Sequence, residues 1–150
     1  MWPNWIAELV RARRAEQALQ PGAPLARYVA DRAVDSAAEH FVQLAVPGLR
    51  CSVQSIFWYG AVDLDTSTCT VWVLLTGEDS TRFPPWLGLT RLDATAIDSD
   101  LPPETLAWLV TLNAELLSRF AVEGWTWEPP RVLLESSERV AQGGGWAYFK

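Results

Sequence analysis

The chain has 150 residues, 49% of them hydrophobic and 20% charged, which indicates one globular domain over residues 1–150 and excludes a disordered chain. Its net charge of −6 repels phosphate backbones, so we expect no nucleic-acid binding. Nine tryptophans are an unusually large number for a chain of this length, and they pack either in the core or at an interface.

The N-terminus and the hydropathy of the chain bear on its location. Glu8 and Arg11 interrupt the first segment before any long apolar run, which argues against a secretory signal. No apolar run approaches the roughly 20 residues that a membrane helix needs. We therefore expect a soluble, cytoplasmic protein with reduced thiols. Abundant alanine and arginine, with Lys150 as the single lysine, are typical of a GC-rich bacterial genome.

Two helices are predicted before residue 50. The first begins at Pro3 or Asn4 and ends at Pro21. The second has apolar residues three and four positions apart and is stopped at Pro47. Its apolar stripe consists of Leu25, Tyr28, Val29, Ala33, Ala37, Phe41 and Leu44.

The apolar pattern then changes to alternation, which predicts a β-hairpin. Segments 50–64 and 69–76 are rich in β-branched and aromatic residues, and 65–68 has the composition of a turn. The simplest register pairs Leu64 with Cys69, and therefore Trp58 with Leu75. One face of this hairpin is then wholly apolar, with Ile56, Trp58, Val62, Leu64, Cys69, Val71, Val73 and Leu75.

The same register separates the two cysteines. Cys51 lies thirteen residues upstream of the partner of Cys69, roughly 40 Å along a straight strand. A disulfide requires Cα atoms within about 7 Å. We therefore predict that both thiols are free.

The second half of the chain is predicted to return to the sheet after an irregular connection over 77–101. Asp100 is the expected N-cap of a third helix and Gly124 its C′ residue. Its expected buried stripe is Leu106, Leu109, Val110, Asn113, Leu116, Leu117 and Phe120. Strands are predicted at 131–136 and 146–149, joined through glycines 143–145 as a flexible hairpin loop.

These elements predict a two-layer α+β fold in the order α-α-β-β-α-β-β. An antiparallel sheet of about four strands would have helices packed mainly on one face. No internal repeat or domain linker interrupts this order.

No constellation of residues predicts catalysis. His40 is the only histidine and lies at the edge of a helical apolar stripe, where we interpret it as a partly buried structural residue. Glycines 143–145 match no phosphate-binding pattern, because they precede a strand instead of opening a helix. The arginines at 11, 13 and 14 are flanked by Glu8 and Glu16, which is typical of a solvated helix face.

A metal site is not predicted either. Asp63, Asp65 and Ser67 follow the start of a calcium-binding loop, but Thr68 and Leu74 stand where glycine and glutamate are needed. The two cysteines and the single histidine lack zinc-ligand spacing. We expect no catalytic residue, metal or cofactor.

The feature with most functional content is the second face of the hairpin. Phe57, Tyr59, Trp72 and Leu74 lie there together with Ala61, Asp63 and Thr70, so this is not the alternating polar face of a solvent-exposed sheet. One interpretation is that other elements cover this face, because most large aromatic side chains are buried. The other is that part of the face is a recognition surface. The full set of candidate binding residues is Phe57, Tyr59, Trp72, Leu74, Trp125 and Trp127.

The leading hypothesis is a non-catalytic protein–protein interaction module. A small, acidic, tryptophan-rich domain without catalytic residues is similar in general profile to toxin-neutralising immunity proteins, which implies an inhibitor of a bacterial toxin or other partner protein. The middle of the chain, 51–101, holds seven acidic residues against Arg82 and Arg91, which favours a basic protein partner.

Two alternatives remain. One is a small-molecule-binding domain or an enzyme of unrecognised type, with a pocket lined by Phe57, Tyr59, Trp72 and Trp127 and with His40 or an acid nearby. The other is a structural subunit of a homo-oligomer.

Overall fold

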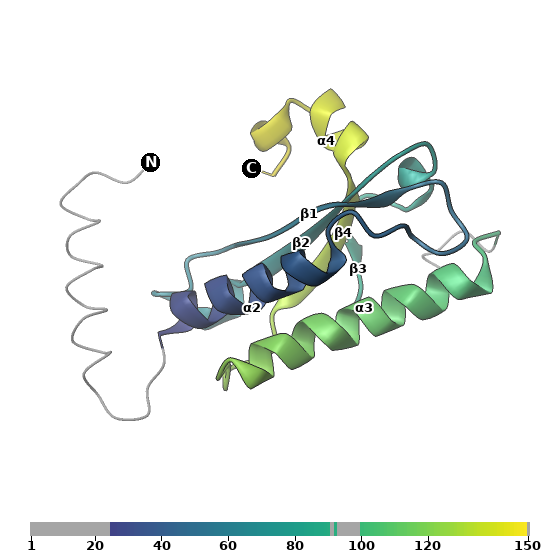
Figure 1. Ribbon diagram of the computed structural model, residues 1–150. Helices are drawn as coiled ribbons and strands as arrows, with labels where there is room; N and C mark the ends of the chain where they lie inside the picture. Colours follow the sequence, from purple (N-terminus) through teal and green to yellow (C-terminus); the bar gives the residue numbers. More distant parts are fainter. Residues whose placement is uncertain (1–24, 91, 93–99, 150) are drawn as a thin grey trace.

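The computed structural model describes residues 25–90, 92 and 100–149, which form a mixed sheet with two long helices on one face (Figure 1). The predicted helix before Pro21 and the arginines at 11–14 lie outside the described residues. The elements are α2 (Ala26–Phe41), β1 (Ser52–Tyr59), η1 (Thr66–Thr68), β2 (Thr70–Thr76), η2 (Ser80–Arg82), β3 (Leu87–Gly88), α3 (Pro103–Val122), β4 (Arg131–Ser136), α4 (Ser137–Gln142) and η3 (Gly145–Phe149).

The sheet confirms the α+β class but is mixed, so the prediction of a purely antiparallel sheet was wrong. The strand order is β1-β2-β4-β3. β2 pairs antiparallel with β1, parallel with β4, and β3 pairs antiparallel with β4. The parallel pair follows from α3, because a long crossover returns the chain to the end of the sheet at which β2 began.

The predicted strand at 146–149 was also wrong, because this segment is the 3₁₀ helix η3. The side chain of Ser136 accepts a hydrogen bond from the Arg139 N–H and caps α4 directly after β4. Gly144 and Gly145 then have positive φ and turn the chain a second time. Glycines 143–145 therefore end a helix instead of forming a hairpin loop, and β3 is the fourth strand.

The hairpin forms, but its register differs from the predicted one by four residues. Phe57 lies opposite Trp72, and Tyr59 lies opposite Thr70. The loop is longer than expected because Asp65 caps η1, accepting a hydrogen bond from the Ser67 N–H at 3.0 Å. Leu64 consequently lies in this loop and is 77% exposed instead of facing the core. A shift of four is even, so the residues from Ser55 to Tyr59 and from Thr70 to Leu74 keep their predicted faces.

The apolar core lies between the sheet and the two long helices (Figure 1). α2 packs on β1 and on α3, and Trp58 donates its indole N–H to Asp31 of α2 at 2.8 Å. The hairpin side chains in this core include Ile56, Val71, Val73 and Leu75, with Val132 and Leu134 from β4.

Helix α3 begins later than predicted. Asp100 is not its N-cap, because each residue before a proline is pushed to extended backbone and helical structure begins only at Pro103. Val110 was wrongly placed in the buried stripe and is 59% exposed, since the buried residues follow Thr105, Leu109, Leu112, Leu116 and Phe120. Gly124 has a φ of 105°, which confirms it as the residue that ends the helix.

Both cysteines are free, as predicted, and both are buried. Burial raises the pKa of Cys69 to about 12, and burial together with Asp79 and Glu138 raises that of Cys51 to about 11. Among the described helices, none is long and apolar enough to cross a membrane.

Candidate functional site

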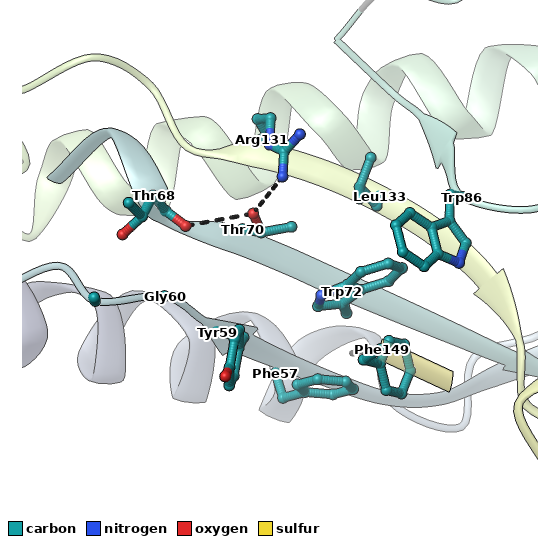
Figure 2. Close-up of a pocket in the computed structure, with 11 residues that line it drawn as sticks. Phe57, Tyr59, Gly60, Thr68, Thr70, Trp72, Trp86, Arg131, Leu133 and Phe149 are labelled. Atoms are coloured by element: carbon teal, nitrogen blue, oxygen red, sulfur yellow. Dashed lines mark hydrogen bonds between the residues drawn. The ribbon is translucent and has the colours of Figure 1, made fainter. Parts of the chain in front are cut away.

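A groove lies on the sheet face opposite α2 and α3. Its floor is built from two cross-strand rows that follow from the register. Phe57, Trp72 and Leu133 form one row across β1, β2 and β4. The next row holds Tyr59, Thr70 and Arg131 (Figure 2). The groove has a volume of about 540 Å³ and is lined by Phe57, Tyr59, Gly60, Ala61, Thr68, Thr70, Trp72, Trp86, Arg131, Leu133 and Phe149.

One part of the aromatic face is buried and another part is exposed. Trp72 is 5% exposed and Leu74 8%, and the rings of Phe149 and Trp86 pack edge-on against Trp72. Tyr59, in contrast, is 69% exposed. The buried part contributes to the stability of the fold, and the ring of Tyr59 remains exposed on the same face.

The ring of Phe149 closes one end of the groove (Figure 2). Its centroid lies 4.8 Å from that of Trp72 and 5.8 Å from that of Phe57, both in edge-on geometry. Such edge-to-face pairs are favourable beyond their buried area because ring edges and faces carry opposite partial charge. The protein therefore shows how an aromatic side chain sits on this floor.

A buried carboxylate holds the C-terminal segment in this place. The side chain of Glu135 is fully buried and accepts hydrogen bonds from Arg139 Nη1 and from the Tyr148 hydroxyl, each at 2.6 Å. It also accepts the backbone N–H groups of Ser136 and Trp86. Burial, followed by the bond to Glu135, raises the pKa of Tyr148. A buried charge satisfied on all sides fixes the groups that surround it.

Trp86 also lines the groove, and its backbone conformation is strained. Its φ is 54°, a left-handed conformation that is costly for a bulky residue. The bond from its N–H to Glu135 at 3.0 Å holds this conformation. Its indole contacts Trp72 edge-on at 5.5 Å and is still 47% exposed. Strain of this kind is concentrated at functional sites in proteins.

Arg131 supplies the charge of the groove. It donates one hydrogen bond from Nη2 to the Thr70 hydroxyl at 3.2 Å, and Figure 2 shows the guanidinium directed toward Thr70. Within the described residues it has no ion pair, unlike Arg32, Arg50, Arg119 and Arg139. Four of the five guanidinium N–H donors thus have no side-chain acceptor in that part of the chain.

A second polar cluster fixes α4 against the end of β2. Glu138 accepts hydrogen bonds from the Thr76 hydroxyl, the Gly77 N–H and the buried Ser80 hydroxyl. Burial opposes its charge, but these donors outweigh that effect and lower the pKa of Glu138 to about 2. Ser80 and Ser136 share a further hydrogen bond at 2.8 Å, so this cluster is internally satisfied and connects η2, β2 and α4.

The structure unites three of the six predicted binding residues in the groove, namely Phe57, Tyr59 and Trp72. Leu74 lies on the same face but is covered. Trp125 and Trp127 lie elsewhere, since Trp125 packs on Phe120 and Trp127 with ring centroids 5.3 and 5.0 Å apart.

The other sequence candidates are also placed away from the groove. His40 is an exposed residue of α2 in edge contact with Phe41. Asp65 of the calcium-like pattern caps η1. In the described part of the chain, no group of three or more histidine, cysteine or acidic side chains is placed to hold a metal.

Sequence reasoning missed Trp86, Arg131, Leu133 and Phe149 as groove residues. Arg131 and Leu133 alternate along β4, so a predicted pairing with β2 would have placed both on the aromatic face. Trp86 comes from an irregular connection and Phe149 from the short 3₁₀ helix η3, and no local pattern specifies where either lies.

Within the described residues, the groove lining is mainly apolar and aromatic. Its titratable lining groups within the described residues are Tyr59 and Arg131. Comparisons of the chain with protein-family models, curated proteins and solved structures gave no match.

Proposed function

We propose that this protein is a non-catalytic binding module that takes an apolar segment of a partner protein into the groove. The observation that carries the proposal is the open apolar groove itself. Its aromatic walls at Tyr59 and Trp86 stay exposed although the neighbouring Trp72 is covered. Exposed apolar surface of this kind is typical of protein interaction sites.

The unfavourable backbone conformation that presents Trp86 to the groove supports the same function. Trp86 adopts a strained backbone to present its ring, and a fully buried carboxylate is needed to hold it. Aromatic side chains with a polar neighbour are typical of the residues that dominate binding energy at protein interfaces. An inhibitor or immunity-type role is one form that such a module would take.

The test is capture of partners from the native host on immobilised protein. Tyr59→Ala removes an exposed wall of the groove without opening the core, whereas Trp72→Ala would remove a buried ring and cost about 3–5 kcal/mol of stability. Tyr28→Ala is the matched control, because Tyr28 is 56% exposed on α2. We expect a partner retained by wild type and Tyr28→Ala and lost with Tyr59→Ala. Identical retention by all three proteins would refute the groove as the site.

A small-molecule ligand is a second candidate, favoured by the groove volume of about 540 Å³. Ligand pockets commonly measure about 300–1,000 Å³. Native mass spectrometry of the purified protein distinguishes the two functions. A bound small molecule that is absent from Tyr59→Ala would favour this candidate over a protein partner.

A further inference from the structure

We infer that the groove recognises a peptide segment in which an aromatic side chain is next to a carboxylate. This inference rests on the proposed function and specifies the chemistry of the partner. Two separate observations carry it: the way Phe149 sits on the floor, and the charge of Arg131 at the next row.

The aromatic part follows from the floor. Phe149 packs edge-on against Trp72 and Phe57, and Trp72 and Thr70 are buried in the floor. The rings of Tyr59 and Trp86, which line the same groove, remain 69% and 47% exposed. A guest ring that enters the groove would meet the exposed rings of Tyr59 and Trp86. Edge-on packing against tryptophan and tyrosine favours an aromatic guest over an aliphatic one.

The acidic part follows from Arg131. Successive rows of a sheet face lie about 7 Å apart along the strands, which neighbouring residues of a peptide span easily. A ring on the Trp72 row therefore brings an adjacent carboxylate to the Arg131 guanidinium. That guanidinium retains donors in the fork arrangement that matches a carboxylate, with no acid of the described residues paired to it.

The overall charge of −6 opposes the attraction of Arg131 for a carboxylate, because at long range it favours a basic partner. At 0.15 M salt the screening length is about 8 Å, so the distant acids count less than a direct contact. We therefore expect a partner that is basic as a whole and carries an acidic–aromatic segment at the contact.

The experiment uses three peptides with acetylated and amidated ends at 0.15 M salt. Their sequences are glycine–phenylalanine–glutamate–phenylalanine–glycine, the same peptide with lysine for glutamate, and one with alanines for both phenylalanines. Binding to the full chain is followed by NMR at the indole N–H signals of Trp72 and Trp86. We expect the glutamate peptide to bind about fivefold more tightly than the lysine peptide, as for one exposed ion pair, and the alanine peptide not to bind.

Arg131→Gln should abolish the preference for glutamate and leave the phenylalanine contribution intact. Arg50→Gln removes an equal charge from a loop arginine outside the groove lining and should change nothing. The inference is overturned if both phenylalanine peptides bind equally, or if Arg131→Gln keeps the preference. Either result leaves the groove as a binding site, so the proposed function would still stand on the capture experiment.

A fourth arm tests the source of the ligand with free 3-phenylpropanoate. Binding of this small carboxylate as tightly as the glutamate peptide would overturn the assignment to a peptide and favour the small-molecule alternative. Binding at least several-fold weaker supports the peptide.

Discussion

Trp86 shows how a single residue is held in a conformation that its own backbone disfavours. A φ of 54° brings the Cβ of an L-residue against its own carbonyl, and only glycine escapes this repulsion. The N–H bond to the buried Glu135 and the edge-on contact with Trp72 offset the strain. The residue is therefore maintained by its surroundings and not by local preference.

This strain predicts an unusual order of stability for two substitutions. Both Trp86→Ala and Trp86→Gly remove the indole, but only glycine relieves the backbone, so Trp86→Gly should be the more stable by about 1 kcal/mol. Urea unfolding followed by far-ultraviolet circular dichroism measures this difference. At Tyr59, in the extended strand β1, alanine should instead be the more stable of the two. The same order at both positions would contradict the strain.

Glu138 predicts how stability depends on pH. Its pKa in the folded protein is about 2, below the ordinary value of 4.5, so the unfolded chain binds its proton first as the pH falls. Its contribution is therefore complete above about pH 4.5 and is lost as the pH falls toward 2. Glu138→Gln should flatten the fall in unfolding free energy across this window. An unchanged slope between pH 5 and about 2 would show that other carboxylates dominate.

At the scale of elements, the loop between β1 and β2 determines one end of the groove. Gly60 has a φ of 151°, and a Cβ there would approach the Thr68 carbonyl oxygen to 2.5 Å. Gly88 in β3 has room, since its Cβ would meet Leu133 at 3.8 Å. The close approach of Gly60 to Thr68 joins the two ends of the loop beside Tyr59.

We expect Gly60→Ala to destabilise the protein by at least about 2 kcal/mol, because a backbone oxygen cannot move aside as a side chain would. Gly88→Ala is the matched substitution and should change stability by less than about 1 kcal/mol. Thermal unfolding of both variants tests this. A small effect at Gly60 would mean that the loop shifts freely.

The elements themselves were largely predictable where the pattern was local. α2, β4 and the two faces of the hairpin follow from periodicity, whereas the register failed because an aspartate cap at Asp65 lengthened a loop that had the composition of a tight turn. The C-terminal strand failed because Ser136 starts a helix there. Both predictions failed at a side-chain cap. Whether such a cap forms depends on the local geometry of the chain and not on the spacing of apolar residues.

On the scale of the whole molecule, the groove combines residues from five segments, and only the hairpin residues among them were predicted. Phe57, Tyr59 and Trp72 share one face through strand alternation. Arg131 reaches them through the parallel pairing of β4, and Trp86 through a buried carboxylate that lies 49 residues further along the chain. Contacts between residues so far apart in the sequence form only in the assembled fold, so they cannot be predicted from a local stretch of sequence.

The two thiols give a test of the assembled core. Both are free and buried with raised pKa values, so neither should react with dithiodinitrobenzoate over minutes at pH 8 in the native protein. In denaturant without reductant, two thiols per chain should react at once. Rapid labelling of the native protein would indicate an open core, and fewer than two thiols in denaturant would indicate a disulfide.

The parallel pairing of β2 with β4 also has a consequence for the order of assembly. Thr70 meets Arg131, so the middle of the sheet closes only after the intervening connection and α3 have been synthesised. Until then one side of β2, whose residues Thr70–Leu75 are all buried in the finished protein, is an unpaired apolar strand edge. A nascent or truncated chain that stops before residue 131 should therefore be prone to aggregation and a target for chaperones.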